Sequence, residues 1–405
     1  MLCAKITPSL PGHYHCVWRT SELRICERTK IANGLPVDSL TQAILGASVG
    51  EAVLGRRLGN WSMAWGAAFG TLPDLDVLFT PFFDHAGWLW WHRGPSHSIL
   101  VMILASLFMA RPLSKLWNKA KVSPTLAGWF VFLVWSTHVL IDCFTTYGTL
   151  IYWPFDGARV AFNNLFIIDP LFTLPIMICL IWAAFIRKTK QLSKRRRLNA
   201  VGLCLACLYV GLSFGAKAII SRNIEADLAR QGVEYSDRFE SPTAFNIILW
   251  RAVVNEEEHI RVGYRSLFDD SSQPMRWTLY PKGREAAATL GRSRELNLVR
   301  HFSGDWWIAR AHAKGIWIGD TRFGEMRDWS NRKGMVDHRF IFSWNLLPSE
   351  DRNRLRPAPR QGRGDVGELM KRLSRRAMGN RESWEANPRL EGVTGSLPEF
   401  LTTIP

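Results

Sequence analysis

Long apolar segments alternate with short polar ones over the first half of the chain. A bilayer core takes about 20 apolar residues to cross, and three runs nearly free of Asp, Glu, Lys and Arg reach that length. These runs are Val122–Ile141, Phe166–Ile186 and Leu198–Ala216. Shorter runs rich in Gly and Ala lie at Ser39–Gly50, Leu58–Pro73 and Gly94–Ala110, and they predict short or tilted helices packed within a bundle. The pattern therefore predicts an α-helical polytopic membrane bundle of five to six apolar helices.

After residue 240 the pattern changes to short, partly alternating segments rich in aromatic and β-branched residues, which are typical of strands. The predicted strands are Ala244–Val254, His259–Leu267, Trp277–Tyr280, Trp306–Ala311, Ile316–Ile318 and Arg339–Trp344. Lys314 and Gly315 are expected to form a hairpin turn between two of them. We therefore expect a small, β-rich soluble domain made of an antiparallel sheet.

The two ends of the chain differ from both regions. From Pro348 onward Arg, Pro, Gly and Glu dominate, which predicts a largely disordered basic tail with one short helix near Val366–Met378. Residues 1–36 lack the apolar core of a signal peptide, and we interpret them as an extension or an over-extended start before Val37. The expected divisions are residues 1–36, a membrane-embedded domain at 37–220, a β-rich domain at 221–347 and the tail at 348–405.

Charge supports a membrane protein and orients it. The formal net charge is +16, and residues 1–220 carry 21 basic against 10 acidic side chains. Because the excess positive charge lies beside long apolar runs, we expect the lipid bilayer as a partner and no direct nucleic-acid binding. Basic residues gather at 56–57, 111–121 and 187–197, so the positive-inside rule places these loops in the cytoplasm. The loops near 73–96 and 142–165, and the C-terminal domain, are then expected on the non-cytoplasmic side.

Ionisable residues within the apolar bundle are costly and therefore call for a partner or a function. Asp74 and Asp76 follow Pro73, His92 and His97 bracket the sequence HRGPSHS, and His138 and Asp142 stand four residues apart on one helix face. The topology brings all of them to the same end of the bundle. We predict that this set binds a metal: Asp74, Asp76, His92, His97, His138 and Asp142.

Carboxylate and imidazole ligands without a thiolate suit a divalent transition metal such as Zn, Mn or Fe. A metal of this kind lowers the pKa of a water molecule that it binds, so the predicted reaction is hydrolysis by metal-activated water. Arg93 is expected to stabilise an anionic substrate or transition state, and Asp76 is the second residue expected to act in catalysis. Asp142 or Asp76 can instead orient a metal-binding histidine through a hydrogen bond, without binding the metal itself.

Each element also has an ordinary structural interpretation. A pair of aspartates after a proline commonly forms a turn or caps a helix, and His138 with Asp142 can be a buried hydrogen-bonded pair. The HRGPSHS sequence can be a helix start at which Ser96 caps the following apolar run. The coincidence of all three at one end of the bundle favours the metal site.

These stretches resemble a family of bacterial membrane-bound metal-dependent hydrolases, also described as LexA-binding, inner-membrane-associated hydrolases. The likeness covers about residues 37–220. It is carried by DSLTQ at 38–42, the run 47–59, GTLPDLD at 70–76, HRGPSHS at 92–98, HVLID at 138–142 with TYGT at 146–149, and WPF at 153–155. The resemblance implies a hydrolase of the bacterial inner membrane and a LexA-type protein partner.

The leading interpretation is a metal-dependent hydrolase that acts on an ester or phosphoester, with lipid-linked substrates included, at the non-cytoplasmic face. One alternative is a lipid phosphatase with His97 as a covalent nucleophile. The expected serine-glycine-histidine order is absent, however, and no arginine precedes His138 at a short distance. Another alternative is a non-catalytic membrane anchor whose C-terminal sheet and tail bind a protein partner.

Overall fold

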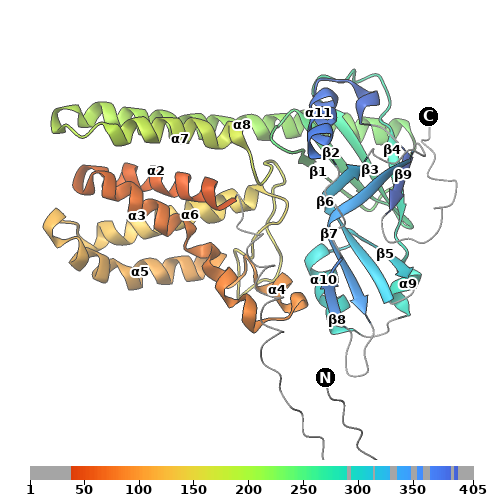
Figure 1. Ribbon diagram of the computed structural model, residues 1–405, viewed down its shortest axis with the longest axis horizontal. Helices are drawn as coiled ribbons and strands as arrows, with labels where there is room; N and C mark the ends of the chain where they lie inside the picture. The colour runs from red at the N-terminus through yellow and green to blue at the C-terminus, as the bar shows by residue number, and fades with distance from the viewer. Residues whose placement is uncertain are drawn as a thin grey trace, which may run out of the picture.

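The computed structural model describes residues 38–289, 293–312, 315–328, 335–347, 354–358, 365–384 and 387–390. The extension at residues 1–36 and the end of the tail at 391–405 lie outside these described residues. Figure 1 shows a helical bundle at one end of the molecule and a β-rich region at the other, with the long helix α8 running from one into the other.

The bundle consists of helices joined by short connections. The longer helices are α2 (Asp38–Leu58), α3 (Asn60–Thr71), α5 (Ile99–Leu116), α6 (Pro124–Phe144), α7 (Pro170–Phe185) and α8 (Leu192–Arg230). The shorter elements are η2 (Pro73–Phe82), α4 (His85–Trp91), η3 (Pro95–His97), η4 (Asn118–Ala120) and η5 (Thr189–Gln191). Its core contains Phe130, Val131 and Val134 on α6, all fully buried.

Three helices in the described part of the chain, α5, α6 and α8, are long and apolar enough to cross a membrane. The helical class of the region is therefore confirmed, and the total of five to six spans stays a prediction. Two lengths differ from expectation: α7 has only 16 residues because Asp169 caps it at Pro170, and α5 continues through Arg111 to Leu116. Ser98, rather than Ser96, caps α5 by accepting a hydrogen bond from the Val101 amide.

Close packing of α2 against α3 is made possible by glycines that face each other. Gly46 and Gly50 on α2 meet Gly66 and Gly70 on α3, and a Cβ atom on any of the four would overlap backbone atoms of the facing helix. Small residues at such spacing let two backbones approach closely in a membrane. This contact holds the end of α3, and the η2 segment that follows it, beside the start of α2.

The β-rich region contains two sheets rather than the single sheet expected. The first is an antiparallel meander of β1 (Asp237–Pro242), β2 (Leu249–Asn255), β3 (His259–Ser266) and β4 (Trp277–Pro281). The second has the order β5 (Trp307–His312), β6 (Gly315–Asp328), β7 (Met335–Leu347) and β8 (Arg354–Pro357), also antiparallel, and β9 (Asn387–Leu390) pairs with β7 in parallel. Strands β5 and β6 pair as expected of a hairpin, up to His312 and Gly315, whereas Lys314 of the predicted turn lies outside the described residues.

The two sheets pack together through one apolar cluster, in which Val262 and Tyr280 of the first sheet contact Ile308 and Phe340 of the second. Helix α8 has 39 residues, about 58 Å at 1.5 Å per residue, so it is far longer than a bilayer core. Its last turns carry Ile220, Ile224 and Leu228 onto the first sheet. The membrane helix thus continues directly into the core of the β-rich region.

Several elements after residue 280 were not predicted. Helices α9 (Arg284–Ala288) and α10 (Arg294–Ser303) lie between the sheets in sequence, and α10 packs against α4 of the bundle. The short helix predicted near Val366–Met378 is confirmed by α11 (Val366–Ala377), in which Leu369 and Leu373, one turn apart, pack on Leu249. The expectation of disorder in the rest of the tail is wrong for η6 (Arg381–Ser383).

Candidate metal centre

Four of the six predicted ligands converge at the end of the bundle that faces the β-rich region. Asp74 lies on η2, His97 on η3, and His138 and Asp142 lie one turn apart on α6. One potential ligand atom from each lies within 4.8 Å of the other three, and all but Asp74 are fully buried. The group can therefore hold a metal ion.

The ligand atoms of the four side chains face a common point. The two imidazole Nε2 atoms of His97 and His138 are 3.1 Å apart. Asp142 Oδ2 lies 3.2 Å from the first and 3.4 Å from the second, and Asp74 Oδ1 lies 3.5 Å from each. Bonds from a transition metal to such ligands are about 2 Å long, so atoms gathered at these separations can surround one ion.

Backbone and hydroxyl contacts behind the imidazoles set their orientation. The Gly70 carbonyl lies 2.6 Å from His138 Nδ1, and because a carbonyl only accepts, Nδ1 carries the proton and Nε2 presents its lone pair to the centre. His97 Nδ1 lies 2.9 Å from the Ser96 hydroxyl. The close glycine packing of α2 on α3 thus has a direct effect on the site, because it holds the Gly70 carbonyl against His138.

The two carboxylate oxygens of Asp142 have different surroundings. Oδ1 accepts a hydrogen bond from Gln42 Nε2 at 2.8 Å and lies 3.2 Å from a terminal nitrogen of Arg93. Oδ2 is buried and has no hydrogen-bond partner in the described part of the chain. A buried carboxylate oxygen without a donor is costly, so this oxygen fits a cation at the centre.

Asp76 and His92 pair with each other beside the four-residue group. His92 Nδ1 lies 3.1 Å from Asp76 Oδ1, and Asp76 Oδ2 accepts the Arg93 amide at 2.9 Å and the Ser96 hydroxyl at 3.5 Å. Asp76 thereby ties the HRGPSHS segment to η2. Burial lowers the pKa of His92 more than Asp76 raises it. Burial raises the pKa of Asp76, but the hydrogen bond and charge of His92, the charge of His97 and the Arg93 amide together lower it.

Arg93 lies at the edge of the group with its backbone in the left-handed region, at φ 54°. Its guanidinium donates to the Thr145 hydroxyl at 3.1 Å, contacts Asp142, and lies 5.2 Å from the centre of the Tyr147 ring. Its carbonyl accepts a hydrogen bond from the Leu150 amide. The loop that follows α6 therefore holds the Arg93 guanidinium beside the proposed ligands.

Three contributors to this arrangement were not predicted as functional residues. Gln42 and the Gly70 carbonyl orient ligands, and Tyr147 covers Arg93. Gln42 and Gly70 lie in the stretches DSLTQ and GTLPDLD that carry the family resemblance, so their position in those motifs was an available signal. Their roles depend on contacts across 100 and 68 residues of sequence, which spacing along the chain does not reveal.

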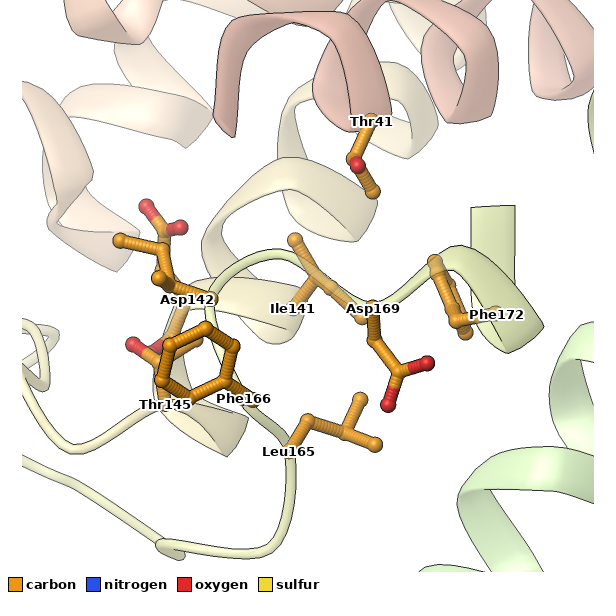
Figure 2. A pocket seen from close by; sticks show the side chains of 9 residues that line it. Thr41, Ile141, Asp142, Thr145, Leu165, Phe166, Asp169 and Phe172 are labelled. Atoms are coloured by element: carbon orange, nitrogen blue, oxygen red, sulfur yellow. The ribbon is translucent and has the colours of Figure 1, made fainter. Parts of the chain in front are cut away.

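A small cavity borders the group on the side of α7 and is shown in Figure 2. Thr41, Phe166 and Phe172 are among its lining residues, and the carboxylates of Asp142 and Asp169 lie on different sides of it. Asp169 accepts the Tyr209 hydroxyl at 2.7 Å and caps α7 through the Leu171 amide. Asp169 is therefore a satisfied helix cap rather than a further ligand.

Two imidazole nitrogens with two carboxylates and no thiolate suit Zn, Mn or Fe, and a metal held by these residues would supply Lewis acidity for hydrolysis. No curated protein and no solved structure matches the chain. Residues 37–220 match the model of the YdjM inner membrane protein family. This part of the chain therefore belongs to the YdjM inner membrane protein family, and the protein is located in the inner membrane.

Proposed function

We propose that this protein is a metal-dependent hydrolase of an ester or phosphoester. The convergence of His97 Nε2, His138 Nε2, Asp74 Oδ1 and Asp142 Oδ2 on one point carries the proposal. Carboxylate oxygens only accept hydrogen bonds, and His138 Nε2 presents a lone pair because Nδ1 donates to the Gly70 carbonyl. Asp74 Oδ1, Asp142 Oδ2 and His138 Nε2 are therefore acceptors that face one another, as a cation requires. Asp76 and His92 complete the proposed set from beside the four.

The chain's own side chains supply the other requirements of hydrolysis. Arg93 is fixed beside Asp142 and can stabilise negative charge that develops on a substrate, which is the largest single contribution in many hydrolytic sites. Asp76 positions Arg93 through its backbone amide and holds His92. A covalent mechanism through His97 is disfavoured because both of its ring nitrogens already face other side chains.

The proposed site lies at the non-cytoplasmic face. It is built from the start of α2, the end of α3, the start of α5 and the end of α6, which all meet at one end of the bundle. The basic residues at 56–57 and 111–121 belong to the opposite ends of these helices, and those at 187–197 lie between α7 and the first turns of α8. By the positive-inside rule the basic end is cytoplasmic.

Metal content tests the proposal directly. The full chain purified in detergent should contain stoichiometric transition metal by elemental analysis, and His97→Ala or His138→Ala should reduce it to about a tenth or less. The exposed His85, on α4 and outside the group, provides the control His85→Ala, which should retain metal. Undiminished metal after both ligand substitutions would overturn the proposal.

Activity and topology are tested on the same protein. Hydrolysis of 4-nitrophenyl phosphate and of 4-nitrophenyl acetate should be lost with EDTA and recovered with Zn or Mn. For topology, an alkaline phosphatase fused after the full chain should be active, and a cysteine in place of Lys119 should be protected from an impermeant reagent in intact cells. Labelling at Lys119 would reverse the orientation and move the site to the cytoplasmic face.

A further inference from the structure

The six residues of the proposed metal centre differ in exposure, and the more exposed ones lie along one edge of it. The side chains of His97, His138, Asp142 and Asp76 are at most 3% exposed, whereas Asp74 is 12% and His92 22% exposed. Asp74 lies on η2, and His92 directly follows α4. A substrate therefore has to reach the centre past these two elements.

The side that faces the β-rich region is closed by aromatic rings. Tyr147 packs on Phe302 with ring centres 5.2 Å apart and on Phe323 at 5.9 Å, and the same ring covers Arg93. Arg159 lies 5.0 Å from the Tyr147 ring and donates to the His92 carbonyl at 2.9 Å. This aromatic layer separates the centre from a larger polar cavity of about 670 Å³ between the loops after α6 and the β-rich region.

The open edge is bordered by an apolar surface. We call residues 73–91, which comprise η2 and α4, the access segment. Asp74 and Asp76 point from η2 toward the centre, while its large apolar side chains point outward: Leu75, Val77, Leu78, Phe79 and Phe82 are all exposed. Trp88 stacks on His92 with ring centres 5.1 Å apart. The same short helix thus supplies a ligand on its inner face and a row of large apolar side chains on its outer face.

Such a surface is stable in contact with lipid and unfavourable in water. Apolar surface left in water is unfavourable in proportion to its area, and Phe82 alone is 79% exposed. The access segment directly follows α3 at the end of the bundle, and its WLWW sequence carries the tryptophans that are enriched at membrane–water boundaries. Its outer face therefore continues the lipid-facing surface of the membrane helices, of which the exposed Ile103 and Leu107 on α5 are part.

We propose that the access segment lies in the boundary layer of the bilayer and admits an amphiphilic, long-chain ester or phosphoester from the membrane to the metal centre. The acyl chain would lie along the outer face of η2, and the ester group would enter between Asp74 and His92. This inference rests on the proposed hydrolase function for its chemistry. The placement of the segment is a separate claim that can be tested without activity.

Spin labels test the placement in the full chain reconstituted in phosphatidylcholine vesicles. Labels at Phe79→Cys and Phe82→Cys should be relaxed more by oxygen than by a water-soluble nickel complex, as should a label at Leu107→Cys on α5. A label at Phe268→Cys, a phenylalanine of the β-rich region whose exposure lies between those of Phe79 and Phe82, should show the reverse. The inference is overturned if the two access-segment labels resemble Phe268, or if they are shielded from both reagents by a protein contact.

Kinetics test the route. We expect Phe82→Ser to raise the KM for phosphatidic acid in vesicles at least about tenfold and to leave kcat/KM for 4-nitrophenyl phosphate unchanged. Phe268→Ser is the matched control and should change neither. Ala158→Trp narrows the polar cavity on the other side, where Ala158 is exposed, and should also change neither. Loss of activity on phosphatidic acid in Ala158→Trp alone would overturn the route, whereas absence of metal from the wild-type protein would overturn the hydrolase proposal instead.

Discussion

Two buried polar clusters lie at opposite ends of α3 in the bundle, and they differ in how donors and acceptors are paired. At the start of α3, Glu51 and Arg195 form an ion pair in which Arg195 Nε donates at 2.6 Å, Ser62 adds a third donor to the carboxylate and Asn60 accepts from the guanidinium. At its end, the proposed ligands turn four potential ligand atoms toward one another.

The Glu51–Arg195 cluster holds helices together, whereas the cluster of proposed ligands suits a bound cation. The Glu51–Arg195 pair joins α2 to α8 across 144 residues, and each charged atom meets its complement. In the other cluster Arg93 and Gln42 satisfy only the outer oxygen of Asp142 and leave Oδ2 without a donor. Burial of charge is common to both, so it is the pairing of donors with acceptors that distinguishes them.

The largest loss of stability is expected when the Glu51–Arg195 ion pair is broken. Arg195→Met leaves Glu51 buried without a counter-charge, and such removal typically costs about 3–5 kcal/mol of unfolding free energy. The melting temperature of the protein in detergent should fall strongly, while molecules that remain folded keep their metal content. The double variant Glu51→Leu with Arg195→Met should recover most of the loss. Equal melting of the single and double variants would contradict the comparison.

Removal of the Arg93 side chain should lower catalytic turnover rather than stability. Because the Arg93 guanidinium lies beside Asp142 Oδ1, and Oδ2 is the oxygen that faces the other ligands, Arg93→Met should spare metal content and lower turnover about 10²- to 10³-fold, the usual range for loss of a donor to developing charge. Elemental analysis and initial rates on the same preparation provide the measurement. A parallel loss of metal and activity would instead make Arg93 a part of the ligand framework.

Metal should stabilise one cluster and not the other. A ligand present at 100 times its Kd adds about 2.7 kcal/mol to the free energy of unfolding. Zinc should therefore raise the melting temperature of EDTA-treated wild-type protein and of Ser62→Ala, whose substitution lies in the complementary cluster. His138→Ala should show no such rise. A similar rise in both variants would place the bound zinc outside the proposed centre.

The same comparison explains which features could be predicted from the sequence. His138 and Asp142 were paired correctly because four residues along a helix place two side chains on one face. The first apolar run was ended at Gly50 because Glu51 is charged, yet α2 continues to Leu58 since Arg195 neutralises that charge from a distant helix. Asp76 and His92 were assigned by residue type as ligands, and only the folded chain reveals that they contact each other.

In the β-rich region the errors have a related cause. Helix α10 was missed because charged residues obscure its pattern, although Leu296, Val299 and Phe302 recur at three-residue spacing and are buried. In the tail, a composition rich in Arg and Gly predicted disorder around the one expected helix, but η6 is also folded there, and the one-turn spacing of Leu369 and Leu373 packs α11 on the first sheet. Composition averages over such periodic positions, and burial depends on them.

The smallest change in stability is expected from an exposed ion pair that joins the helical bundle to the β-rich region. Arg294 on α10 donates to Asp84, the N-cap of α4, at 2.7 Å, but their side chains are 56% and 36% exposed. Exposed pairs contribute about 0–1 kcal/mol and are weakened by salt, so Arg294→Ala should shift the melting temperature little, and less still at 0.5 M salt. The apolar contact of Ala86 and Leu89 with Leu296 and Val299 remains in this variant and should keep α10 on α4. A loss as large as that of Arg195→Met would mean that exposure does not separate the strong pairs of this protein from the weak ones, and complementarity alone would then have to explain both.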